Sequence, residues 1–115
     1  MLKQIESIVL FVADVDAAAH WYADMFDVAV QYENRKYAFI QTPYMRIGFQ
    51  PIDAKSPGGV GGTTVFWQVD NVAFAMDSLI ARGAQRQRGP YVSETGATIA
   101  IVVDPFGCAL GLSGA

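Results

Sequence analysis

One arrangement of strand and helix signals occurs twice along the 115 residues, and this duplication constrains the fold more than any other feature. Each half begins with a strand rich in β-branched and aromatic residues, continues with an amphipathic helix, and ends with three short strand segments. The halves match at an offset of roughly 56 to 57 positions, which places Ser7 opposite Thr64 and Asp14 opposite Asp70. The chain is therefore predicted to contain two βαβββ modules.

Local signals set the bounds of these modules. In the first half we expect a strand, a helix and three strands at 5–12, 13–26, 28–32, 37–41 and 46–50. In the second half we expect the same elements at 63–69, 70–83, 85–92, 97–103 and 108–113. Two prolines and four glycines in 51–62 indicate a linker. The modules thus span about 4–50 and 63–113 of a single domain, 1–115.

Each module has one helix, which covers one face of a small sheet and leaves the other face open. We therefore predict an α+β fold in which two tandem βαβββ modules form a curved mixed sheet around a concave trough, with the helices on the convex face. A trough of this kind is a natural binding site for a small molecule.

Composition excludes several other classes of protein. Hydrophobic residues make up 52% and charged residues 17%, as expected of an ordered globular chain. The net charge of −3 argues against nucleic acid as a partner, and no apolar run is long enough to cross a membrane. The single cysteine excludes an internal disulfide and fits a reducing compartment. We expect a cytoplasmic protein.

The last predicted strand has an unusual distribution of side chains. It follows a tight turn at 104–107, in which proline and glycine suit the turn geometry. Cys108, Leu110 and Leu112 share one face, whereas the opposite face carries only Ala109 and Gly111. Either another group lies close to the backbone there, or a functional side chain has been lost.

Three stretches resemble the vicinal oxygen chelate superfamily, which includes glyoxalase I, extradiol dioxygenases, fosfomycin resistance enzymes and bleomycin-binding proteins. They are VADVDAAAHWYADMFDV at 12–28, VDNVAFAMDSLIARGA at 69–84 and VVDPFGCALGL at 102–112. The chain departs from the family pattern at two dipeptides: Trp21-Tyr22 replaces the usual Phe-Tyr, and Phe26-Asp27 replaces the usual Leu-Gly. The resemblance spans nearly the whole chain and implies the fold predicted above.

The resemblance also indicates where a metal would bind. Metal-dependent members carry His or Gln on the first strand and Glu on the last strand of each module. The matching positions here are Ser7, about Gly48, Thr64 and Gly111. Hydroxyls are weak neutral donors and glycine has no side chain, so these residues suit a divalent cation poorly. The resemblance therefore implies the metal-free branch, with no cofactor, and Gly111 stands where the metal-binding glutamate would be.

Strand alternation assigns the side chains that would line the trough. We expect two aromatic rings, one cation and several neutral polar groups, which suit a flat, partly polar organic ligand. The predicted ligand-binding residues are Ser7, Phe11, Arg46, Gln50, Thr64, Phe66, Gln68 and Gly111. Tyr37 and Phe39 are possible additions, because the facing of the third strand is open. The rings could instead fill space left by a lost metal site, and Arg46 could pair with an acidic neighbour.

Two other reactive residues are assigned structural roles. His20, the only histidine, lies mid-helix with no companion at metal-ligand spacing, so we expect it at the surface. Cys108 shares the face of two leucines and is expected to be a buried thiol.

Three functions remain open. The first is metal-independent binding or sequestration of a small, partly aromatic molecule, as in antibiotic resistance proteins of the bleomycin type. The second is a glyoxalase-like lyase or isomerase, or a dioxygenase-type metalloenzyme, with atypical ligands. The third is an interaction module with no small ligand. In each case the resemblance implies a homodimer.

Overall fold

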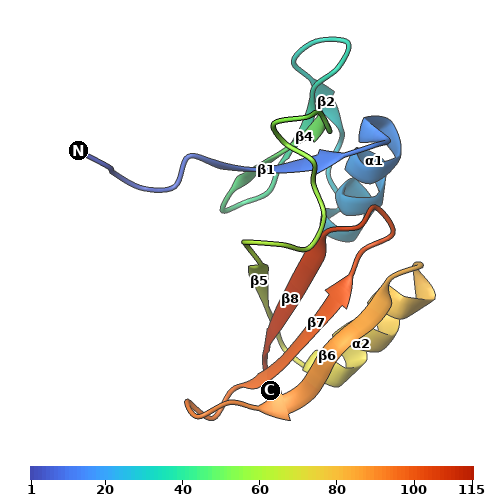
Figure 1. Ribbon diagram of the computed structural model, residues 1–115. Coiled ribbons are helices and arrows are strands. Elements are labelled where there is room, and N and C mark those ends of the chain that lie inside the picture. Colours follow the sequence, from blue (N-terminus) through green and yellow to red (C-terminus); the bar gives the residue numbers. More distant parts are fainter. The chain divides into compact units, whose positions relative to one another are not determined.

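Two βαβββ units make up the computed structural model, which describes residues 1–115 (Figure 1). Unit 1 is Met1–Gly58 and unit 2 is Gly59–Ala115, so the boundary falls inside the segment predicted as a linker. The α+β class and the duplicated module are confirmed.

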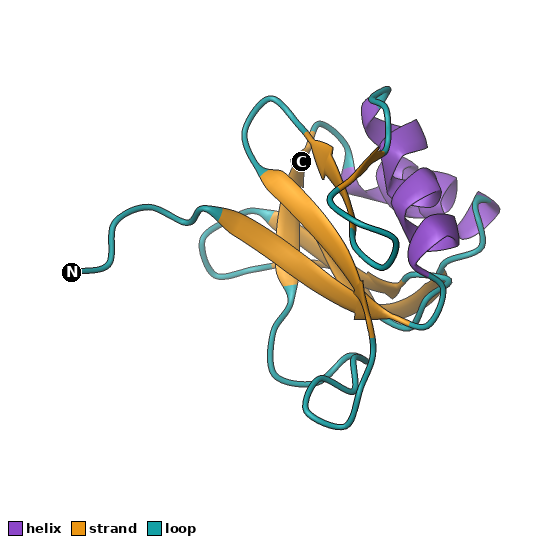
Figure 2. Cartoon of the chain, turned by 90° about the horizontal axis from the view of Figure 1, so that it is seen from above, coloured by secondary structure: helices purple, strands orange, loops and turns teal.

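Unit 1 contains one helix and a four-stranded mixed sheet. Its elements are β1 (Ser7–Val12), α1 (Val15–Phe26), β2 (Gln31–Tyr32), β3 (Ala38–Gln41) and β4 (Arg46–Pro51). The strand order is β1-β4-β3-β2, with β1 parallel to β4 and the other pairs antiparallel. The predicted strand at 28–32 is reduced to two residues, because β2 pairs with β3 only at Gln31 and Tyr32. Residues 1–6 precede β1 as an exposed segment (Figure 2).

Unit 2 repeats this topology. Its elements are β5 (Val65–Val69), α2 (Val72–Ala81), β6 (Gln85–Val92), β7 (Thr98–Val103) and β8 (Ala109–Gly114). The strand order is β5-β8-β7-β6, and β5 is parallel to β8. The edge strand β6 is the longest strand of the unit, although its pairing with β7 is broken by two register shifts.

The helices begin at equivalent capped positions. Asp14 Oδ1 accepts a hydrogen bond of 3.0 Å from the amide of Ala17, and Asn71 Oδ1 accepts one of 2.8 Å from Phe74. Each cap satisfies an amide that the first helical turn leaves unpaired. Asn71, rather than Asp70, is therefore the counterpart of Asp14, which corrects the sequence-based match by one residue.

The core of each unit lies between the helix and one face of its sheet. In unit 1 the helix buries small residues and Tyr22 against the strands, and Ile40, Ile47 and Phe49 are at most 1% exposed. The Tyr22 and Phe49 rings lie 5.6 Å apart. In unit 2, Val72, Met76 and Leu79 of α2 are buried, as are alternate residues of β7 and β8. Burial on only one face leaves the opposite face of each sheet free of helix.

The turns before the last strands are held by two buried polar side chains. Asp104 is 3% exposed, and its Oδ1 accepts hydrogen bonds from the amides of Phe106 (2.8 Å) and Cys108 (2.9 Å). Thr42 is 4% exposed, and its Oγ1 accepts hydrogen bonds from the amides of Tyr44 and Met45. These acceptors satisfy amides that the tight turns would otherwise leave without a partner in the protein. The predicted turn at 104–107 is confirmed.

Cys108, the single cysteine, is a free thiol. The thiol is buried as predicted, and burial, assisted by the nearby Asp104 carboxylate, raises its pKa to about 11. Neither helix has the length and apolar character needed to span a bilayer.

Candidate functional site

The open face of unit 1 displays the side chains that alternate with the core residues. The parallel register of β1 and β4 places Ser7 beside Arg46, Val9 beside Gly48 and Phe11 beside Gln50. Ile47 and Phe49, which lie between these positions on β4, are buried under α1. Because successive residues of a strand face opposite ways, the three cross-strand pairs lie on the face without a helix.

The third strand adds an aromatic ring to this face. Phe39 on β3 is the antiparallel partner of Gly48, which has no side chain to separate the ring from its neighbours. The Arg46 guanidinium lies over the Phe39 ring, with Cζ 3.6 Å from the ring centroid. This contact is a cation–π interaction, and it fixes the plane of the guanidinium. The facing of Phe39, which the sequence left open, is thus toward the open face.

These side chains surround a small cavity of about 160 Å³, which we call the face hollow. Its floor is the β4 backbone at Gly48, and its walls come from β1, β3 and the loop between β2 and β3. Its lining residues are Glu6, Ser7, Val9, Glu33, Tyr37, Ala38, Phe39, Arg46, Gly48 and Gln50.

A larger cavity of about 750 Å³, which we call the end hollow, lies where β1 and β4 end and α1 begins. Tyr37 and Gln50 line both cavities, so the two hollows adjoin. The lining residues of the end hollow are Phe11, Ala13, Asp14, Val15, Asp16, Tyr32, Arg35, Lys36, Tyr37, Gln50, Pro51, Ile52 and Asp53. Its volume lies within the range of drug-sized ligand sites.

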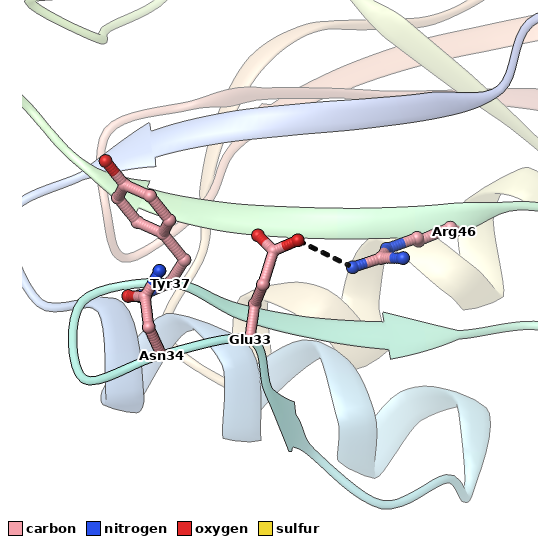
Figure 3. Close-up of polar contacts among 4 residues, drawn as sticks. All are labelled: Glu33, Asn34, Tyr37 and Arg46. Carbon is pink, nitrogen blue, oxygen red and sulfur yellow. Dashed lines mark hydrogen bonds and ion pairs between the residues drawn. The ribbon is translucent and has the colours of Figure 1, made fainter.

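The β2–β3 loop borders both hollows and is ordered by Asn34. Its Oδ1 accepts hydrogen bonds from the amides of Lys36 (2.9 Å) and Tyr37 (3.1 Å), and the Glu33 amide donates to the Tyr37 carbonyl. Figure 3 shows Glu33 pointing from this loop toward Arg46, with a separation of 3.9 Å between Oε1 and Nη2. The loop therefore presents Glu33 and Tyr37 to the face hollow.

One further hydrogen bond ties the end hollow together. The Tyr32 hydroxyl donates to Asp16 Oδ1 at 2.8 Å. This bond, with partial desolvation and the nearby Asp16 charge, raises the pKa of Tyr32 above its usual value.

In unit 2, the face of β8 that carries Gly111 is covered by an aromatic ring. Gly111 is the cross-strand partner of Phe66, and a Cβ at Gly111 would lie only 2.4 Å from Phe66 Cδ1. The aromatic ring therefore occupies the space above the glycine. Phe66 is 47% exposed, so it covers the strand without being buried itself. Thr64 lies just before β5, and Gln68 is exposed farther along it.

The residues predicted to bind a ligand are thus divided between the units. Ser7, Arg46 and Gln50 line the face hollow, and Phe11 and Gln50 line the end hollow. Thr64, Phe66, Gln68 and Gly111 lie in unit 2 and belong to neither hollow. Sequence reasoning named Tyr37 of the β2–β3 loop as a possible addition but missed Glu33. The polar run ENRK at 33–36 marks the loop, but nothing local indicates that it borders a cavity.

The positions of the family's metal ligands do not fit a divalent cation. Ser7 and Thr64 offer only hydroxyls, and the space for a side chain at Gly111 is filled by Phe66. No group of three His, Cys, Asp or Glu side chains comes together anywhere in the 115 residues. His20 is exposed on α1, with Nδ1 2.8 Å from the Asp16 carbonyl oxygen, and lines neither hollow.

Replacement of Gly111 by alanine is expected to lower the free energy of unfolding by about 1–3 kcal/mol, because the Phe66 ring must move. The equivalent change Gly48→Ala should cost less than about 1 kcal/mol, since its Cβ would meet Val9 Cγ2 at 3.4 Å, an ordinary contact. Urea denaturation measures both. Equal losses at the two glycines would contradict the assignment, as would an undiminished loss from Gly111→Ala in a Phe66→Ala background.

Two tandem βαβββ units with this strand order define the vicinal oxygen chelate class of proteins. The family model described as Glyoxalase/Bleomycin resistance protein/Dioxygenase superfamily matches residues 4–112, and the chain belongs to this superfamily. No curated protein matches the chain.

Solved structures show the same fold. A glyoxalase/bleomycin resistance protein/dioxygenase family enzyme from Burkholderia phytofirmans has a TM-score of 0.81 and 18% identity, covering 97% of this chain and 98% of its own. The fosfomycin resistance protein FosX from Listeria monocytogenes, complexed with Mn(II) and sulfate, has a TM-score of 0.78 and 15% identity, covering 99% and 91%. The bleomycin resistance determinant encoded on transposon Tn5 has a TM-score of 0.68 and 19% identity, covering 97% and 98%. At these identities the likeness extends to the fold alone.

Proposed function

We propose that this protein binds a small, partly aromatic organic molecule on the open face of unit 1, without a metal ion. The observation that carries the proposal is the convergence of ring and polar groups on the face hollow from three strands. Phe39 and Tyr37 supply aromatic surface, Arg46 supplies a cation, and Ser7 and Gln50 supply neutral hydrogen-bonding groups.

The polar groups of the face hollow favour a ligand because they are not used within the protein. The side chains of Ser7, Tyr37 and Gln50 have no hydrogen-bond partner in the structure, although all three are partly shielded from solvent. Unpaired donors and acceptors beside an aromatic wall suit a ligand that combines a flat ring with a few polar atoms. Sequestration of such a molecule is a role consistent with the bleomycin resistance determinant among the structural neighbours.

The test is a thermal-unfolding assay with three probes that share a naphthalene ring: 2-naphthoate, 2-naphthamide and 2-naphthylmethylammonium. At least one probe should raise the Tm, and a ligand at 100 times its Kd stabilises the folded state by about 2.7 kcal/mol. The rise should be the same in EDTA and in added Mn(II). A Gly48→Leu variant, which places a side chain on the floor of the face hollow, should abolish the rise and is matched by Gly48→Ala.

A metalloenzyme with atypical ligands is the second candidate, favoured by the Mn(II) complex of the FosX neighbour. Elemental analysis of the purified protein separates the two functions. A divalent metal at near one per chain, together with probe binding that disappears in EDTA, would overturn the metal-independent proposal. Because the hydroxyl and glycine positions fit a cation poorly, we expect a divalent metal content well below one per chain.

We also propose that the protein forms a homodimer in the cytoplasm. Each four-stranded sheet ends in strands with no hydrogen-bonded neighbour on their outer side, namely β1 and β2 in unit 1 and β5 and β6 in unit 2. Such edges favour association with another chain. Light scattering at micromolar concentration should give twice the monomer mass of 12.5 kDa, and a monomer mass would refute the assembly.

A further inference from the structure

The Arg46 guanidinium makes no hydrogen bond within the protein. A guanidinium has five N–H donors arranged to meet two carboxylate oxygens at once. In this structure its only polar contact is with Glu33, at 3.9 Å, which is too long for a hydrogen bond. The Phe39 ring covers one flat side of the guanidinium and leaves the N–H groups at its edge unpaired.

The position of Arg46 is better defined than that of a typical surface arginine. Its side chain is 35% exposed, and the ring contact at 3.6 Å restricts its orientation. Preorganisation of this kind reduces the entropy that a ligand must overcome on binding. Glu33, by contrast, is 58% exposed and projects from a loop, so its ion pair with Arg46 is weak.

Most other carboxylates around the hollows are already hydrogen-bonded. In the end hollow, Asp14 caps α1 and Asp16 accepts from Tyr32. Asp53 accepts from the amides of Lys55 and Ser56, so each of these carboxylates already has a donor. Two carboxylates of the face hollow, Glu6 and Glu33, have no hydrogen bond, and a cationic ligand is therefore the competing possibility.

We propose, building on the ligand-binding function above, that the natural ligand of unit 1 carries a carboxylate, which pairs with Arg46 in place of Glu33. The aromatic part of the ligand lies against Phe39 and Tyr37. Its carboxylate accepts hydrogen bonds from the Arg46 N–H groups, from which Glu33 is too distant. Glu33 acts as a competing counter-ion that the ligand displaces. Arg46 is therefore the residue that determines specificity for an acid over its neutral amide.

The experiment measures the Kd of 2-naphthoate, 2-naphthamide and 2-naphthylmethylammonium by titration calorimetry. The wild-type protein should bind the naphthoate at least 10-fold more tightly than the amide, because a charge-assisted contact exceeds a neutral one. Arg46→Gln should weaken naphthoate binding about 10-fold and leave the amide within about 2-fold. Glu33→Gln should tighten naphthoate binding about 2- to 5-fold, because the competing counter-ion is lost.

Control variants separate local contacts from overall charge. Arg88→Gln and Glu94→Gln make the same charge changes at exposed positions of unit 2, and both should leave the naphthoate Kd within about 2-fold of wild type. Arg35→Gln removes a cation from the end hollow and should have a similarly small effect. Circular dichroism confirms that each variant is folded.

The possible failures can be told apart. If the amide binds as tightly as the naphthoate and Arg46→Gln changes neither, the inference about Arg46 is wrong while the proposed binding function stands. If the ammonium probe binds best and Glu33→Gln weakens it, the ligand is a cation and the inference is overturned. If Arg35→Gln rather than Arg46→Gln weakens the naphthoate, the anchor is misassigned. If no probe binds, the proposed function fails and the inference fails with it.

Discussion

Replacement of Phe49 by alanine is expected to lower the free energy of unfolding by about 3–5 kcal/mol. Phe49 is 0% exposed, its ring lies 5.6 Å from that of Tyr22, and its strand partners are Leu10 on β1 and Ala38 on β3. The substitution removes a large buried side chain from the junction of the helix and three strands. A rigid helix and sheet cannot close the resulting cavity completely.

The same substitution should also weaken ligand binding. Phe49 separates Gly48 and Gln50, which line the face hollow from the opposite side of β4. Urea denaturation followed by tryptophan fluorescence in a Trp67→Phe background reports on unit 1, because the remaining Trp21 packs edge-on against Tyr22. Phe49→Leu keeps most of the volume and should cost less than about 1.5 kcal/mol. A loss below about 1 kcal/mol for Phe49→Ala would contradict the position of this residue in the core.

Replacement of Asp104 by alanine is expected to lower the free energy of unfolding by about 2–3 kcal/mol. The side chain is 3% exposed and accepts hydrogen bonds from the amides of Phe106 and Cys108. Alanine leaves both amides without this acceptor, and the cost of an unsatisfied buried donor applies in full to the Cys108 amide and in part to the half-buried Phe106 amide. Asp104→Asn retains one acceptor oxygen and should recover at least half of the loss.

The Cys108 thiol gives this experiment a second readout. The Asp104 carboxylate helps burial to raise the thiol pKa to about 11, so Asp104→Asn should lower that pKa while leaving it above the ordinary value. A raised pKa stabilises the folded protein fully below the thiol's unfolded pKa, and this contribution is lost as the pH rises toward 11. Thiolate absorbance measured against pH gives the shift. An unchanged thiol pKa, or an alanine variant as stable as wild type, would contradict the assigned role of Asp104.

The two units place different chemistry at equivalent positions. In unit 1 the pair Val9 and Gly48 leaves the sheet face hollow, whereas in unit 2 the pair Phe66 and Gly111 is covered by an aromatic ring. Duplication of the module therefore did not duplicate the hollow. The candidate ligand site lies wholly in unit 1, where a valine rather than a phenylalanine stands beside the glycine.

Local features of the sequence were sufficient for the order of strands and helices, the faces of β1, β4, β5 and β8, the first helix cap and the turn at 104–107. Alternation along a strand and capping of a helix depend on residues within a few positions of one another, so they can be recognised without knowing the rest of the fold. The length of β2 was predicted poorly for the opposite reason. Its extent depends on pairing with β3, which supplies partners only for Gln31 and Tyr32.

Only the tertiary structure decided which side chains meet. Ser7 and Arg46 are neighbours because β1 pairs with β4, far along the chain, and Glu33 reaches Arg46 because Asn34 orders the intervening loop. The absence of a side chain at Gly111 was visible in the sequence, but the ring that covers it was not assigned until β5 and β8 were placed in register. A cavity is formed by residues brought together across strands, and long-range pairing, rather than any local pattern, sets those neighbours.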